Sequence, residues 1–119
     1  MADALSLVSR RRGNEVKESV VIYVVATLKI KPETRAELIA GAQACIAETR
    51  KEAGNISYDM HESVTDPTTM VFVEQWSSVE ALVPHRSSEH VKVFGRIVAN
   101  CAAAPAKIEI ITPAKVDVR

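Results

Sequence analysis

A run of apolar residues that begins at residue 20 limits the folds open to this chain. Residues 20–30 read VVIYVVATLKI, which is rich in β-branched residues and apolar at both sets of alternating positions for most of its length. β-Branched residues favour strands, so the run predicts a strand that is apolar on both faces. Helices of the same chain can cover one of these faces, and another protein surface has to cover the second.

The rest of the sequence alternates between helical and strand periodicity. A helix is predicted from Pro32 to about Gly54, where apolar residues recur at helical spacing: Leu38, Ile39, Ala42, Cys45, Ile46 and Thr49. Strands are predicted over 56–64 and 69–76, joined by a turn at Asp66-Pro67. In the first of them, one face is expected to hold Ile56, Tyr58, Met60 and Val64.

Two helices and a strand complete the predicted pattern. A short helix is predicted over 79–83 and a longer one after Ser87 or Ser88, whose apolar stripe is Val91, Phe94, Ile97, Val98 and Cys101. A last strand is predicted over 107–112. The order β-α-β-β-α-β, with right-handed crossovers and one hairpin, predicts an α+β ferredoxin-like fold: a four-stranded antiparallel sheet with helices on one face.

The uncovered face of this sheet predicts a partner. Strands 20–30 and 69–76 are apolar on both faces, whereas an antiparallel sheet with one face in water should alternate. We therefore expect a two-fold homodimer that packs sheet against sheet, with further assembly left open.

Length and charge narrow the classes of function. The 119 residues fit one domain over 20–113, between an N-terminal extension (1–19) and a C-terminal tail (114–119). Basic and acidic residues balance at 15 each, so no basic field attracts nucleic acid or an anionic membrane. We see no membrane-span pattern and no convincing signal peptide, so the expected location is the cytoplasm. Cys45 and Cys101 lack metal-ligand spacing and are expected to be buried thiols.

The stretch from Val71 to Val91 concentrates the side chains that can do chemistry. It holds the only tryptophan, Trp76, and two of the three histidines, His85 and His90. Alternation places Phe72, Glu74 and Trp76 on one strand face, with Tyr58 and Phe94 as expected neighbours. Such aromatic residues also cluster in cores that bind no ligand, so both readings stay open.

Glu74 is a carboxylate among aromatic side chains, where burial would raise its pKa. Three arrangements are open. The carboxylate can pair with Arg86 or Arg96, lie at the rim where its strand ends, or serve an active site as a proton acceptor or as the group that orients His85.

The histidines have structural and functional interpretations of similar weight. His85 is expected at the junction of two helices, and His90 at the edge of an apolar stripe. Their separation of five residues places them on different faces of a continuous helix, and no third ligand is evident. We therefore predict no metal site. His61 lies on the polar face of its strand and is expected to be solvated or at the dimer contact.

Several short motifs together resemble a known family. They are Glu52-Ala53-Gly54-Asn55-Ile56-Ser57-Tyr58, Asp66-Pro67, Val73-Glu74-Gln75-Trp76, Ala81-Leu82 and the two histidines His85 and His90. In combination they resemble the antibiotic biosynthesis monooxygenase superfamily, and within it the small quinol monooxygenases, over about residues 20–113. The resemblance implies a dimeric α+β barrel that oxygenates a quinol or polyphenolic aromatic with molecular oxygen and without a metal, flavin or haem.

The resemblance also suggests roles for single residues. A dihydroxyaromatic that loses a proton can pass an electron directly to oxygen, which requires a base, an apolar pocket and protection from water. The candidate base is His85, oriented by Glu74. Trp76, Phe72 and Phe94 would hold the ring. Tyr58 and His90 would bind its oxygens, and Asn55 matches a family position at the start of the second strand.

Other functions stay open beside this one. The superfamily's haem-degrading members carry an Asn on the first strand, and residues 20–30 contain none. An isomerase of a small phosphorylated ketose would need cationic phosphate ligands, for which Arg86, Lys92 and Arg96 are the nearby candidates. A non-catalytic dimeric binding or stress-response module would need none of these roles.

Overall fold

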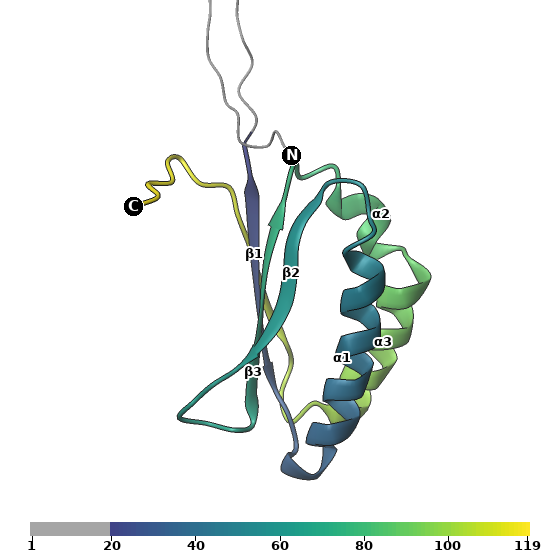
Figure 1. Cartoon of the computed structure of the whole chain (residues 1–119). Coiled ribbons are helices and arrows are strands. Elements are labelled where there is room, and N and C mark those ends of the chain that lie inside the picture. Colours follow the sequence, from purple (N-terminus) through teal and green to yellow (C-terminus); the bar gives the residue numbers. More distant parts are fainter. Residues whose placement is uncertain (1–19) are drawn as a thin grey trace, which may run out of the picture.

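The structure is a computed structural model that describes residues 20–119, so the predicted extension over 1–19 lies outside the described residues. The elements are β1 (Ile22–Lys29), the 3₁₀ turn η1 (Pro32–Thr34), α1 (Arg35–Thr49), β2 (Asn55–Glu62), β3 (Thr69–Trp76), α2 (Leu82–Arg86), α3 (Glu89–Cys101) and β4 (Lys107–Ile111). The strands form one antiparallel sheet in the order β2-β3-β1-β4 (Figure 1). The predicted α+β ferredoxin-like fold is confirmed.

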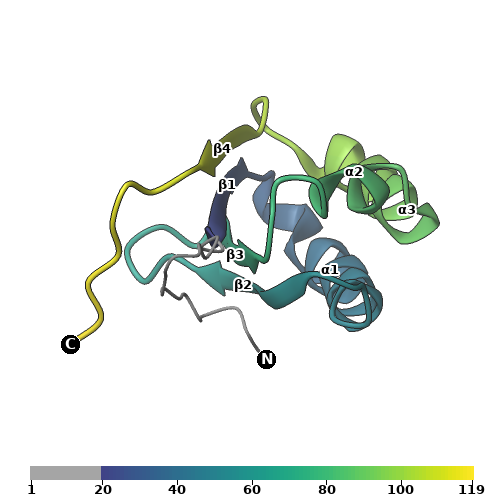
Figure 2. The same cartoon turned by 90° about the horizontal axis from the view of Figure 1, so that it is seen from above.

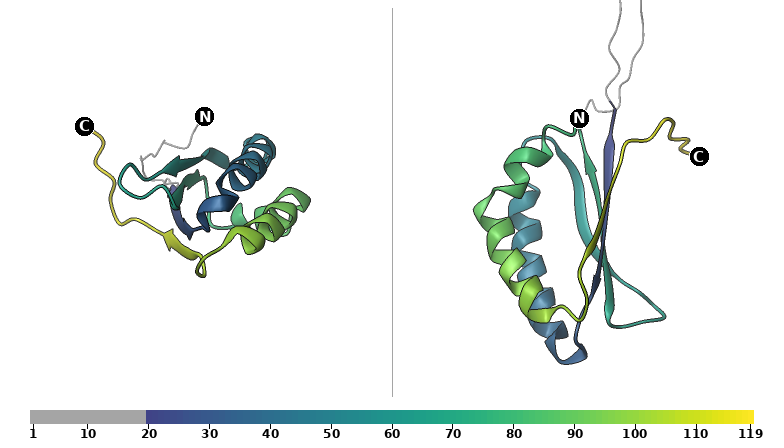
Figure 3. Two further views of the ribbon diagram at one scale, coloured as in Figure 1. Left: turned by 90° about the horizontal axis from the view of Figure 1, so that it is seen from below. Right: turned by 180° about the vertical axis from the view of Figure 1, so that it is seen from behind.

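The molecule has two layers, a sheet and a pair of helices. α1 and α3 lie side by side over one face of the sheet, and the opposite face carries no helix of the described chain (Figures 2 and 3). The core fills the space between the layers and is built from apolar residues of β1, β2, β3, α1, α2 and α3. One face of the sheet is therefore left open, as predicted.

β1 lies between β3 and β4 and alternates across the sheet. Ile22, Val24, Ala26 and Leu28 are buried under the helices, whereas Tyr23, Val25 and Thr27 are half-buried on the open face. Tyr23 and Val25 on the open face add to the apolar residues under the helices, which accounts for the apolar character of both faces of this strand.

The predicted apolar stripes of the two long helices are buried or half-buried. They meet closely near Gly41 of α1, where an added Cβ would lie 2.7 Å from Ile97 Cδ1. Glycine at this position lets α1 approach α3.

Three local predictions need correction. α1 ends at Thr49, about five residues before the expected end, and turns lead from there into β2. The short helix is Leu82–Arg86 and not 79–83; Pro84 is tolerated because the first turn of a helix needs no N–H donor there. The predicted face of β2 is wrong at two residues. A register shift between Asn55 and Ser57 leaves Ile56 exposed, and β2 ends before the fully exposed Val64.

The β4 edge is the least covered part of the sheet. All five residues of β4 are exposed, including Ile108 and Ile110, which pair with Ala26 and Val24 of β1 and so share the helix side. Figure 2 shows β4 at the edge of the sheet, away from α1. The space beside it is the cavity described below.

Within residues 20–119, every helix is too short or too polar to cross a membrane.

Candidate functional site

A cavity of about 300 Å³ lies between the sheet and the helices α2 and α3. This volume is at the lower end of the range for small-molecule sites, ~300–1,000 Å³. Most of its wall is apolar, and its polar residues are Glu74, His85, Arg86 and Tyr58. The other lining residues are Val24, Ala26, Leu28, Phe72, Leu82, Val91, Phe94, Gly95, Val98, Ala106, Ile108 and Ile110.

Glu74 is a buried carboxyl group in the wall of this cavity, with 6% of the residue exposed. Its Oε1 accepts a hydrogen bond of 2.8 Å from Trp76 Nε1, and among residues 20–119 it forms no ion pair with Arg86 or Arg96. Burial raises its pKa to about 7, and the negative charge of Glu52 adds to this, while the hydrogen bond from Trp76 opposes it. Near neutral pH the carboxyl can therefore hold or release a proton.

The raised pKa predicts a pH-dependent stability that Glu74→Gln removes. The folded chain binds this proton more tightly than the unfolded chain, so the free energy of unfolding falls as pH rises from 4.5 to about 7. Glu74→Gln keeps an acceptor for Trp76 and should be more stable than the natural chain above neutral pH, by up to about 3 kcal/mol. Below about pH 4.5 the two should match. Denaturant unfolding at both pH values measures the difference, and an equal difference at both would contradict the assignment.

His85 is buried in α2 and is oriented by Glu52, not by Glu74. Its Nδ1 lies 3.0 Å from Glu52 Oε2, and its ring packs 4.7 Å from Trp76 between centroids. The prediction that Glu74 orients His85 is therefore wrong: the carboxylate that contacts the imidazole is that of Glu52, and the hydrogen bond of Glu74 within residues 20–119 is with Trp76. An Nδ1–H that donates to a carboxylate fixes the tautomer and leaves Nε2 as a proton acceptor.

Glu52 belongs to the motifs that resemble the family, but the sequence pattern assigns it no role. It lies in the turn after α1, where its N–H donates to Thr49 O at 2.9 Å. The turn contacts the segment after β3, because Ser77 N–H donates to Gly54 O at 2.8 Å. Gly54 has φ +89°, and a Cβ there would lie 2.7 Å from Ala81 Cβ. This close contact brings Glu52 next to α2.

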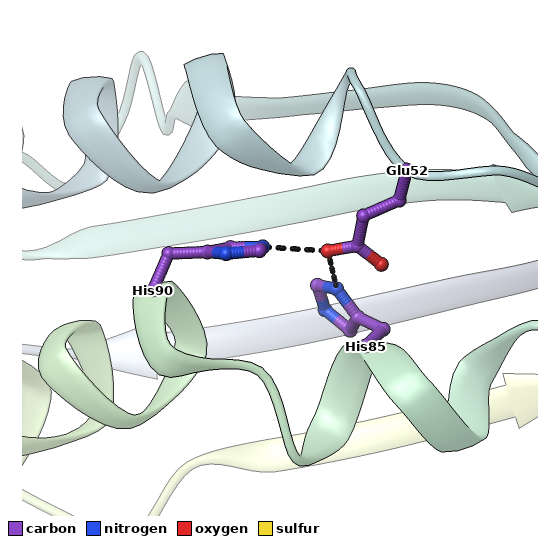
Figure 4. Close-up of side chains that lie close together, drawn as sticks. All are labelled: Glu52, His85 and His90. Carbon is purple, nitrogen blue, oxygen red and sulfur yellow. Dashed lines mark hydrogen bonds and ion pairs between the residues drawn. The ribbon is translucent and has the colours of Figure 1, made fainter.

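His90 contacts the same carboxylate oxygen from α3. Its Nε2 lies 2.5 Å from Glu52 Oε2, and Figure 4 shows both imidazoles directed at that atom. The helix is broken between the two histidines: α2 ends at Arg86, and Ser88 caps α3 by accepting a hydrogen bond from Val91 N–H. Both premises for excluding a metal pair, a continuous helix and the lack of a third ligand, are therefore wrong.

The other predicted site residues are divided between the cavity and its surroundings. Phe72 and Phe94 line the cavity, as does Tyr58, whose hydroxyl lies 3.8 Å from Cys45 Sγ on α1. Burial raises the pKa of Tyr58, which keeps its phenol neutral. Trp76 is fully buried and lies outside the lining.

His90 and Asn55 do not line the cavity either. Asn55 instead lines a separate hollow with Val73 and His61, and its side chain donates to Ser57 O at 3.2 Å. The exposed His61 fits the prediction of a solvated position. Cys45 and Cys101 are buried free thiols, as predicted.

Comparisons with known proteins identify a family that this chain resembles. The family model described as Antibiotic biosynthesis monooxygenase matches residues 21–96, a range that contains Glu52, Glu74, His85 and His90. "Putative monooxygenase YcnE" of Bacillus subtilis is 35% identical over 74 residues, which cover 62% of this chain and 78% of that protein. "Putative monooxygenase Rv0793" of Mycobacterium tuberculosis is 33% identical over 92 residues, which cover 77% of this chain and 90% of that one.

Solved structures share the same fold. The structure of Rv0793 from Mycobacterium tuberculosis superposes with a TM-score of 0.76 at 30% identity and covers 82% of this chain and 99% of its own. A conserved protein from Methanosarcina mazei gives a TM-score of 0.77 at 29% identity, over 79% of this chain and 93% of its own.

Proposed function

The chain belongs to the antibiotic biosynthesis monooxygenase family, and we propose that it is a cofactor-independent monooxygenase that oxidises a quinol or polyphenolic aromatic with molecular oxygen. One observation carries the proposal. An apolar cavity contains an imidazole held by a carboxylate, His85 on Glu52, together with the carboxyl of Glu74, whose pKa is raised to about 7. These groups supply acid–base chemistry beside a surface that suits an aromatic ring.

The cavity walls support the choice of an aromatic substrate. Phe72 and Phe94 lie with ring centroids 5.6 Å apart, and Tyr58 lies 5.2 Å from Phe72. A planar ring against them gains apolar burial and edge-to-face contacts. A ring hydroxyl is then bound near His85 and Glu74. The hydroxyl of Tyr58 is engaged beside Cys45, so Tyr58 contributes its ring to the wall.

The proposed reaction needs no external reductant. His85 Nε2 takes a proton from a ring hydroxyl, and the electron-rich anion gives one electron to oxygen, which becomes superoxide. The two radicals join through a carbon–oxygen bond, and His85 returns its proton to the peroxide anion, which gives a hydroperoxide. The ring C–H then gives up its proton as the oxygen–oxygen bond breaks. This proton and the leaving hydroxide form water, and the ring carbon becomes a carbonyl. A quinol and one oxygen molecule thus give a hydroxyquinone and one water, so oxygen accepts four electrons from the substrate.

Two further residues act through others in this proposal. Glu52 positions His85, and Trp76 positions Glu74 through its hydrogen bond of 2.8 Å. Glu74, with its raised pKa, can carry the ring C–H proton to the peroxide oxygen that leaves as water. His90 and Asn55 have no contact with the cavity, so we assign neither to the substrate.

The alternatives have weaker support. Of the three cations considered for a phosphorylated ketose, Arg86 lines the cavity, whereas Lys92 and Arg96 do not. One cation in a mostly apolar wall is a poor site for a phosphate dianion. A binding module would use the same cavity without turnover, and the experiment below distinguishes the two.

Oxygen consumption tests the proposed function directly. The full chain should consume oxygen with at least one member of a panel of benzoquinols, dihydroxynaphthalenes and anthrones, beyond autoxidation in buffer. The product should contain one atom from labelled oxygen gas. Binding of a ring compound without oxygen uptake would favour the binding module. If the chain shows neither binding nor oxygen uptake with the panel, both functions are excluded.

We further propose that the open face of the sheet forms a homodimer. Val73 and Val25 are cross-strand partners on this face, where Val73, Ile56 and Ile111 are exposed and Val25 is half-buried. The face on which these residues lie carries no helix of residues 20–119 (Figure 3). A two-fold arrangement would bury this face against its own copy.

Val73→Lys should convert the dimer into a monomer, because it places a charge in the centre of the buried face. Light scattering after size exclusion measures the mass. Val93→Lys is the matched control: Val93 is 41% exposed on α3, against 40% for Val73, and lies away from the sheet. A dimer that survives Val73→Lys, or is lost in Val93→Lys, would contradict the proposed interface.

A further inference from the structure

We propose that Glu52, His85 and His90 form a binding site for a divalent transition metal ion of the zinc class. The three side chains come from three segments: the turn after α1, the helix α2 and the helix α3. One carboxylate and two neutral imidazoles are a ligand set that suits zinc and its neighbours in the first transition row.

The ligand atoms have the required proximity. Glu52 Oε2, His85 Nδ1 and His90 Nε2 all lie within 4.8 Å of one another. Ligand atoms around a tetrahedral zinc ion lie roughly 3–3.5 Å apart, because each bond is ~2.0–2.2 Å long. Side-chain rotations that move the ligand atoms by about an ångström would convert the observed arrangement into the tetrahedral one. Three protein ligands leave a fourth position for water.

The backbone around the three ligands is held in place before any metal arrives. Ser88 Oγ donates to His85 O at 2.7 Å and caps α3 by accepting from Val91 N–H, which fixes the two histidines relative to each other. Asn55 N–H donates to Glu52 O at 3.2 Å in the turn that holds the carboxylate. A site whose supporting contacts already exist loses little conformational entropy on binding.

Charge at the cluster favours a cation. The Glu52 side chain is 16% exposed, and within residues 20–119 its close side-chain partners are the two histidines and not any Lys or Arg. A hydrogen bond from a neutral imidazole does not neutralise the carboxylate. A divalent ion bound between the three side chains would neutralise it, and the partial exposure of Glu52 and His90, at 16% and 21%, gives the ion a path from solvent.

Metal binding would change the chemistry of His85. When a metal takes Nδ1, the hydrogen of the neutral ring lies on Nε2, so the ring can no longer accept a proton there. Zinc loading is then expected to inhibit oxygen uptake. This consequence rests on the proposed function, whereas the binding site does not.

Zinc binding to the untagged full-length chain tests the inference without turnover. After chelator treatment and dialysis against zinc chloride, metal analysis should find one zinc ion per chain. Cobalt(II) should give the visible absorption bands of a tetrahedral site. Glu52→Gln and His90→Gln each remove a ligand while keeping a hydrogen-bonding side chain, and each should weaken zinc binding by at least about 100-fold.

His61→Gln is the matched control, because His61 is the third histidine of the chain and lies on the open face. It should bind zinc as the natural chain does, and circular dichroism should show that all variants are folded. If the natural chain retains no zinc, the proposal is overturned. Equal binding by the Glu52 and His90 variants, or loss of binding in His61→Gln, would overturn it as well.

Discussion

His85→Gln is expected to lower kcat for oxygen uptake by about 10²–10⁴-fold, the range that a general base contributes. Glutamine can keep a hydrogen bond to Glu52 but cannot accept the proton of a ring hydroxyl at neutral pH. The substrate should still bind, because the apolar walls of the cavity are unchanged. We therefore expect KM to change much less than kcat, as steady-state oxygen consumption will measure.

Glu52→Gln separates positioning from base catalysis. Its amide oxygen can still accept from His85 Nδ1–H, so the loss in kcat should be smaller than for His85→Gln, with a changed pH profile. His61→Gln should behave as the natural chain. Full activity of His85→Gln would remove this residue from the mechanism and leave Glu74 as the base, which Glu74→Gln would then test.

Trp76→Ala is expected to lower the free energy of unfolding by about 3–5 kcal/mol, the cost of removing a large aromatic side chain from a core. Trp76 is the last residue of β3; its side chain is fully buried and packs against His85 and Tyr58. The change also removes the hydrogen-bond donor of the buried Glu74 carboxyl. Guanidinium unfolding measures the loss.

Trp76→Phe divides this effect into packing and hydrogen bonding. Phenylalanine keeps much of the apolar contact but has no N–H, so the variant should fold with a smaller loss of stability. Without the donor, the pKa of Glu74 should rise above about 7, because the hydrogen bond from Trp76 lowers it in the natural chain. An unchanged Glu74 titration in Trp76→Phe would show that the hydrogen bond does not act on the carboxyl.

The sequence predicts the fold well because the signals that specify it are local. The β-branched, apolar composition of 20–30 and 69–76 and the helical spacing in the two long helices each depend on a few neighbouring residues, and the element order then leaves few topologies. The residues at which helices and strands begin and end were predicted less well. The exposed position of Ile56 depends on a bulge, which is set by the pairing of β2 with β3 and not by the composition of β2.

The site was predicted where it depends on one strand and missed where it depends on a turn. Alternation brings Phe72 and Glu74 to one face, and both line the cavity. The pairing of Glu52 with His85 joins residues 33 positions apart, and it forms because Gly54 lets two loops touch. Spacing within one segment carries no signal for such a contact. The spacing of the two histidines predicted different faces of one continuous helix. The helix is instead broken at Ser88, and His90 points toward the same carboxylate as His85.

The burial of the chain's single tryptophan gives the site an internal optical reporter. Trp76 lies 4.7 Å from His85 between ring centroids and donates a hydrogen bond to Glu74, so its indole lies within reach of changes at both residues. Its fluorescence should be blue-shifted, as for an indole shielded from water, and its intensity should follow the protonation of Glu74 near pH 7. Ring compounds or zinc near His85 should also alter the emission. Occupancy of this site can thus be followed in solution with the natural chain and no added label.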